Sequence, residues 1–128
     1  MMKLTYPGPS FLVSYHNHSN WSDGAASLET VCREAKKIGL KEFGLSDHYV
    51  VPPKENMNSE EWSMRLDRLD EYIAALQTMK KELDDDSFTL RIGLEVDFFF
   101  ENADSVLKNL MQLKWQILLL EHLNIHML

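Results

Sequence analysis

Hydrophobic and polar residues follow two different periods along this chain, and segments with each period alternate. Three segments are rich in β-forming residues and are bounded by glycine, proline or acidic residues, as strands are. They cover residues 11–16, 41–48 and 88–100. Segments 27–38 and 62–83 repeat apolar residues every three or four positions, which predicts amphipathic helices packed on a core.

Capping residues support these helices. Ser27 is a suitable N-cap for the first helix, and Gly39 is a suitable residue just beyond its end. The further predicted caps are Ser59 for the second helix and Asn102 or Asp104 for a third helix that continues to about Leu113. Strands that alternate with helices predict an α/β fold with a parallel sheet and helices outside it. A closed barrel of this kind needs roughly 200 to 250 residues, and this chain has 128.

Charge and composition argue against several classes of protein. The chain has 20 acidic and 13 basic residues and a net charge of −7, which disfavours a nucleic-acid partner bound through its phosphates. No apolar run approaches the roughly 20 residues of a membrane span. The single cysteine, Cys32, cannot form an internal disulfide, and the first residues do not resemble a signal peptide. We therefore predict a cytoplasmic protein without a membrane anchor.

Residues that bind metals occur at the carboxyl ends of the predicted strands. His16 and His18 are two positions apart, so alternation along a strand predicts that both point to one face. His48 ends the second strand, and Glu95 lies in the third. Small or polar residues share the face of each, which leaves room for ions, water and substrate. Parallel α/β folds gather their sites at these strand ends, so we expect the four residues to converge.

The donor set contains nitrogen and oxygen but no thiolate. Asp23 adds a carboxylate from the loop after the first strand, where Gly24 permits a tight turn. Cys32 falls on the buried side of a predicted helix. Such a set favours Zn, Fe or Mn over a structural cysteine site. Several close divalent ions can hold a phosphate and lower the pKa of a bound water, so the sequence predicts metal-assisted hydrolysis.

Three motifs, in order along the chain, resemble those of the polymerase and histidinol phosphatase (PHP) family. They are HNHSNWSDG at 16–24, GLSDH at 44–48 and GLEVDF at 93–98. Residues 69–83 also resemble the helix before the third motif in the histidinol-phosphatase branch. The resemblance covers about Ser10 to Leu113. It implies an α/β fold that is the N-terminal portion of a distorted, TIM-like (βα)7 barrel.

The same resemblance implies a metal centre. By motif, His16, His18 and Glu95 would bind one ion, with Glu95 bridging to a second. Asp23 and His48 would bind a third. The expected cofactors are up to three divalent ions of Zn, Mn or Fe, and the implied partner is a small phosphorylated metabolite. In the histidinol-phosphatase branch, L-histidinol phosphate is hydrolysed to L-histidinol and phosphate in histidine biosynthesis.

Two further carboxylates are interpreted as supports for these ligands. Asp47 lies on the strand face opposite to His48, so we expect it to hydrogen-bond near a ligand and not to bind an ion. Asp97 shares the face of Glu95, where it could orient a ligand or contact a metal, and we interpret it as a support for a ligand.

The end of the chain departs from the family pattern. The family's Gly-Ser-x-His strand end and two later ligand segments are missing, and residues 114–128 do not resemble the strand expected next. We therefore interpret 1–113 as a half-barrel and 114–128 as an atypical tail, in a truncated chain that is out of frame near its end. His122 and His126 would share a helix face in this tail, but a frayed end is the expected structure.

Three functions are compatible with these patterns. The first is a phosphomonoesterase of the histidinol-phosphatase type. The second is a half-barrel that binds metal with little or no activity, because later ligands are missing. The third is a nuclease of the same family, which the net charge disfavours. Uncovered barrel edges also predict self-association.

Overall fold

The computed structural model describes residues 12–51, 61–104, 108 and 122–127. Strands and helices alternate along it. One short 3-10 helix precedes the long second helix, and another follows the long fourth strand. The elements are β1 (Val13–Ser14), α1 (Leu28–Lys37), β2 (Glu42–Leu45), β3 (His48–Val50), η1 (Leu66–Arg68), α2 (Leu69–Leu83), β4 (Thr89–Phe98), η2 (Phe100–Asn102) and β5 (His122–Met127).

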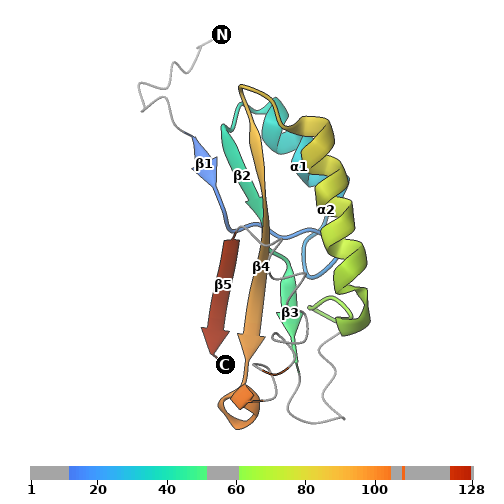
Figure 1. The fold of residues 1–128 in the computed structure, drawn as a ribbon, viewed down its shortest axis with the longest axis vertical. Coiled ribbons are helices and arrows are strands. Elements are labelled where there is room, and N and C mark those ends of the chain that lie inside the picture. The colour runs from blue at the N-terminus through green and yellow to red at the C-terminus, as the bar shows by residue number, and fades with distance from the viewer. Residues whose placement is uncertain (1–11, 52–60, 105–107, 109–121, 128) are drawn as a thin grey trace.

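All strand pairs in the described part of the chain are parallel. β1 pairs with β2, while β2, β3 and β5 all pair with the long strand β4. The helices α1 and α2 lie side by side next to this sheet (Figure 1). Leu28 of α1, Leu76 of α2 and Leu90 of β4 are fully buried in one core. The predicted α/β fold with a parallel sheet is therefore confirmed.

The first helix has the ends that the sequence predicts. The Ser27 hydroxyl accepts a hydrogen bond from the main-chain N–H three residues later, and Gly39 has a φ of 95°, where a side chain would be strained. The second helix begins later than predicted, because η1 precedes α2 and Trp62 lies in a turn. Its predicted cap, Ser59, lies outside the described residues, as does most of the predicted third helix.

The first predicted strand is shorter than 11–16. Only Val13–Ser14 is strand among its described residues. The Asn17 side chain then donates hydrogen bonds to the carbonyl oxygens of Ser14 and Gly44, at 3.3 and 3.0 Å. An amide side chain thus takes the place of a main-chain ladder bond, and the chain leaves the strand before both histidines of the first motif.

The second predicted strand is interrupted. β2 ends at Leu45 and β3 begins at His48, so Ser46 and Asp47 leave strand geometry between them. Both parts nevertheless pair with β4 in one register, with Leu45 opposite Ile92 and His48 opposite Glu95. The prediction of a strand over 41–48 was therefore right in position and wrong in continuity.

In the tail, residues 122–127 are described, and they form a strand. β5 pairs along β4 over six residues, with Asn124 opposite Glu95 and His126 opposite Asp97. His122 and His126 therefore do not lie on a helix, and their backbone is paired, so the expectation of a frayed end was wrong. No helix in the described ranges is long and apolar enough to cross a membrane.

Candidate metal centre

Four segments bring metal-binding side chains to one place. His16 and His18 follow β1, Asp23 lies in the loop before α1, His48 begins β3, and β4 carries Glu95 and Asp97. These side chains form three overlapping groups, each with donor atoms within 4.8 Å of one another. The convergence of the predicted residues is therefore found in the structure.

The first group joins His16 and His18 to Glu95. The Glu95 Oε2 atom lies 2.9 Å from His16 Nε2 and 2.7 Å from His18 Nε2. Glu95 is only 3% exposed, whereas His16 is exposed. One side of this group therefore opens to solvent and the other side is buried in the sheet.

The second group joins His18 and His48 through Asp23. Asp23 Oδ1 lies 2.6 Å from His18 Nδ1, and its Oδ2 lies 3.3 Å from His48 Nε2. The two imidazole rings have centroids 4.4 Å apart. Burial lowers the pKa of His18, but the hydrogen bonds and charges of Asp23 and Glu95 outweigh it and raise that pKa above its ordinary value. Burial raises the pKa of Asp23, but its contacts with the histidines outweigh that effect and lower it.

The third group joins His48 and Glu95 to Asp97, which was interpreted from the sequence as a support for a ligand. Asp97 Oδ2 lies 2.5 Å from His48 Nδ1, and Glu95 Oε2 lies 3.7 Å from the same nitrogen. Both carboxylates are buried. The parallel register produces this group, since His48 is opposite Glu95 and β4 presents Asp97 two residues later.

The donor set fits divalent cations. It consists of three imidazoles and three carboxylates, while Cys32 lies on the buried side of α1, in the core. Ligand atoms that share a cation at about 2.1 Å lie roughly 3 Å apart. The closest contacts between donors in the first two groups, 2.6 to 3.3 Å, are of that size. Neutral imidazole and carboxylate suit Zn, Mn or Fe.

Strand alternation was the wrong reason for the convergence of His16 and His18. The register places Ser14 opposite Phe43 of the core, and the Tyr15 hydroxyl donates to Glu42. Continued alternation would therefore carry both histidines toward the helices. They reach Glu95 because the chain leaves the strand at Ser14.

Asp47 lies outside the three groups. Its carboxylate accepts hydrogen bonds from the Ser19 amide, the Ser19 hydroxyl and the Ser22 hydroxyl, at 2.7, 2.7 and 2.6 Å. Ser19 and Ser22 were missed by the sequence analysis, although both lie within the first motif. A small hydroxyl residue directly after a ligand, and another directly before the next ligand, was the available signal.

Gly24 is required for a reason other than the predicted turn. Its φ is not positive, whereas a Cβ on it would lie 2.5 Å from the carbonyl oxygen of His18. The Gly24 N–H also donates to the Ser19 carbonyl oxygen at 2.8 Å. The loop therefore closes on the main chain beside His18, and only glycine allows this approach.

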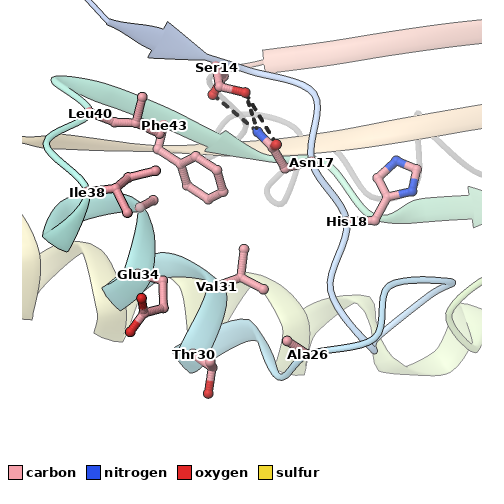
Figure 2. Close-up of a pocket in the computed structure, with 11 residues that line it drawn as sticks. Ser14, Asn17, His18, Ala26, Thr30, Val31, Glu34, Ile38, Leu40 and Phe43 are labelled. Atoms are coloured by element: carbon pink, nitrogen blue, oxygen red, sulfur yellow. Dashed lines mark hydrogen bonds between the residues drawn. The ribbon is translucent and has the colours of Figure 1, made fainter. Parts of the chain in front are cut away.

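A groove of about 480 Å³ lies beside the centre, between α1 and the edge formed by β1 and β2 (Figure 2). Apolar side chains such as Val31 and Phe43 line it, and Asn17 and His18 border its end. Ile38, at the end of α1, is 69% exposed on its rim. An apolar groove at an edge strand is a surface that another segment can cover.

Comparison with known proteins agrees with this geometry. The family model of the PHP domain matches residues 14–124, which include every residue of the three groups. The chain belongs to the PHP domain family. The match extends past Leu113 into β5, so the family likeness covers more of the chain than the motifs alone indicate.

A search of curated proteins found no match. Among solved structures, the chain is similar to a Listeria monocytogenes protein designated as a candidate histidinol phosphatase, with 20% identity and a TM-score of 0.65. The similarity covers 81% of this chain and 41% of that one. It shows a shared fold, and this chain spans about two fifths of the length of that protein.

Proposed function

We propose that this chain provides the metal centre of a phosphomonoesterase. The observation that carries the proposal is the convergence of three imidazoles and three carboxylates from four segments. Membership of the PHP family supports it. The proposed cofactors are up to three Zn, Mn or Fe ions.

The three groups suggest how the residues divide the ions. His16, His18 and Glu95 would hold one ion. Glu95 Oε2 lies 2.7 to 3.7 Å from nitrogens of three imidazoles, as suits a carboxylate that bridges to a second ion. Asp23 and His48 would hold the third.

Bound divalent ions would supply Lewis acidity to a phosphate ester and lower the pKa of a water molecule. The chain's own contribution is orientation. Asp23 contacts Nδ1 of His18, which directs Nε2 of that ring to Glu95. Asp97 contacts Nδ1 of His48, whose Nε2 faces Asp23. Carboxylates that fix imidazoles in this way raise metal affinity. The exposed side, at His16, is where an anionic ester would enter.

The substrate that we propose is L-histidinol phosphate. The histidinol-phosphatase-like segment 69–83 coincides with α2 in the structure, and the fold is similar to that of the Listeria protein. A small phosphorylated metabolite also suits the net charge of −7 better than a nucleic acid does. The cytoplasmic location predicted from the sequence belongs to the same proposal.

Phosphate release from L-histidinol phosphate with Mn²⁺ or Zn²⁺ tests the activity. Glu95→Gln should abolish it, whereas Glu82→Gln, which changes an exposed carboxylate paired with Arg33, should leave it unchanged. Absence of phosphate release by the metal-loaded wild type, in an assay where a full-length relative is active, would refute the activity of this chain.

A half-barrel that binds metal with little activity is the second candidate. The observation that favours it is the coverage of the Listeria protein, which leaves more than half of that chain without a counterpart. Metal analysis separates the two: tight binding of two or more ions per chain contradicts a weakened centre. Hydrolysis of single-stranded DNA by the pure protein would instead favour the nuclease.

We also propose that the chain associates with a second copy through the groove. Among the described residues, β1 pairs with β2 alone, so its other edge offers main-chain groups to a partner. Ile38 adds exposed apolar surface on the rim of the groove, 69% accessible. Ile38→Glu should convert a dimer to a monomer in sedimentation, while Leu66→Glu, on η1, should not. A monomeric wild type refutes this proposal.

A further inference from the structure

The loop between His18 and Asp23 is built around a buried carboxylate. Asp47 is fully buried, and both of its oxygens accept hydrogen bonds from this loop. Oδ1 accepts from the Ser19 N–H and the Ser22 hydroxyl, and Oδ2 accepts from the Ser19 hydroxyl. Three donors on one carboxylate fix the path of the loop from one proposed ligand to the next.

Hydrogen bonds within the loop also shape this path. The Ser22 N–H and the Gly24 N–H both donate to the Ser19 carbonyl oxygen, at 3.2 and 2.8 Å, and the Asn20 N–H donates to Ala26. These bonds make the loop compact, but they do not attach it to the sheet. The bonds to Asp47 do, because Asp47 lies between β2 and β3.

A residue of α2 in turn fixes the main chain of Asp47. Its main-chain N–H donates to the Tyr72 hydroxyl at 3.1 Å, and that hydroxyl also lies 3.1 Å from the Gly93 carbonyl oxygen. The Tyr72 ring contacts Trp21 of the loop, with centroids 5.7 Å apart, and Arg68 covers the Trp21 ring at 4.3 Å. One end of α2 therefore holds both the loop and the residue that anchors it.

We propose that Asp47 is a positioning residue that sets the separation between Asp23 and the His18 and His48 rings through Ser19 and Ser22. It adjoins His48 in the chain and is bonded to the residue after His18 and to the residue before Asp23. The positions of all three members of the second group therefore depend on one carboxylate, that of Asp47. The metal part of this inference rests on the proposed function, and the loop part does not.

Co²⁺ is a suitable probe, because its visible absorption reports both affinity and ligand geometry. Residues that orient metal ligands typically change affinity by about 10- to 100-fold when removed. We expect Asp47→Ala to weaken Co²⁺ binding at least about tenfold. Ser22→Ala, which removes one of the three bonds and cannot leave a buried charge unpaired, should weaken it by roughly threefold to tenfold.

Asp47→Asn tests whether Asp47 acts by positioning the loop or by its negative charge. The amide oxygen can still accept from the Ser19 N–H, and the amide nitrogen can donate to a serine hydroxyl oxygen. Positioning therefore predicts that Asn keeps Co²⁺ affinity within about threefold of wild type. Asn binding as weakly as Ala would show that charge acts and would overturn the inference.

Leu76→Ala is the control for lost stability, since Leu76 lies on α2 and is fully buried in the core. It should lower the melting temperature without changing Co²⁺ affinity. Asp47→Ala with wild-type affinity and spectrum would refute the inference. If Asp47→Ala does not fold, Ser22→Ala takes its place in the test. Unchanged Co²⁺ affinity of Ser22→Ala would then refute the inference.

Hydrogen exchange of the Ser19 amide gives a readout without metal. Asp47→Ala should speed this exchange at least about tenfold relative to core amides, because a charge-assisted bond is lost. Unchanged exchange refutes the anchoring of the loop. A wild type that binds no Co²⁺ refutes the proposed function, while the exchange experiment still decides the role of Asp47 in the loop.

Discussion

Replacing Gly24 with alanine changes the centre without altering any proposed ligand. The added Cβ would lie 2.5 Å from the His18 carbonyl oxygen and 2.7 Å from the Ser19 carbonyl carbon. Both are main-chain atoms, so no side chain can rotate away. The loop that carries Asp23 must instead move away from the segment that carries His18.

The size of this movement follows from the contacts. Reaching 3.0 Å, the limit below which real Cβ atoms essentially never approach, needs a shift of about 0.5 Å, more than the about 0.2 Å tolerance of metal–ligand distances. We therefore expect divalent-metal affinity to fall at least about tenfold, or about 1.4 kcal/mol. Overpacking costs about 1–3 kcal/mol of stability, and the lower entropy of unfolded alanine offsets about 0.4–1 kcal/mol of it.

Metal titration and urea unfolding measure the two effects separately. Gly39→Ala is the matched control, because Gly39 has a φ of 95° and open space around its Cβ position. It should cost about 1–2 kcal/mol of stability through backbone strain and leave metal affinity unchanged. If Gly24→Ala binds metal as tightly as wild type, the close approach at His18 does not set the geometry of the centre.

Three other expectations concern the rest of the chain. Burial raises the pKa of Cys32 to about 12, so the thiol should react with iodoacetamide only after unfolding, and labelling of the native protein would contradict the buried core. Tyr72→Phe removes the hydroxyl at the break between β2 and β3 and should lower the free energy of unfolding by about 1–3 kcal/mol in urea titrations, which an unchanged midpoint would disprove. The hydrogen bond from Lys36 lowers the pKa of Asp85, so its contribution to stability is present above the unfolded pKa and is lost as the pH falls through the folded pKa. Asp85→Asn should thus be less stable than wild type at pH 7, with a difference that disappears in acid, and a difference that persists in acid would argue against the pair.

The sequence by itself predicted α1 and the candidate ligands that the structure brings together. Local signals were sufficient for α1, because its apolar period, Ser27 and Gly39 act within a few residues of each other. The motif residues were also predictable, since histidine and carboxylate at the ends of parallel strands meet at one edge of a sheet. The ions that they bind and the substrate remain predictions.

Only the tertiary structure decided how the ligands reach one another. The departure of the chain from β1 depends on a bond from Asn17 to Gly44 of the neighbouring strand. The break at Asp47 depends on Tyr72, which comes from a helix 25 residues later. The strand β5 forms by pairing with β4 over six residues, although its own sequence pattern did not indicate a strand. In each case the partner that decides the structure is distant in sequence, so no local periodicity or propensity could predict it.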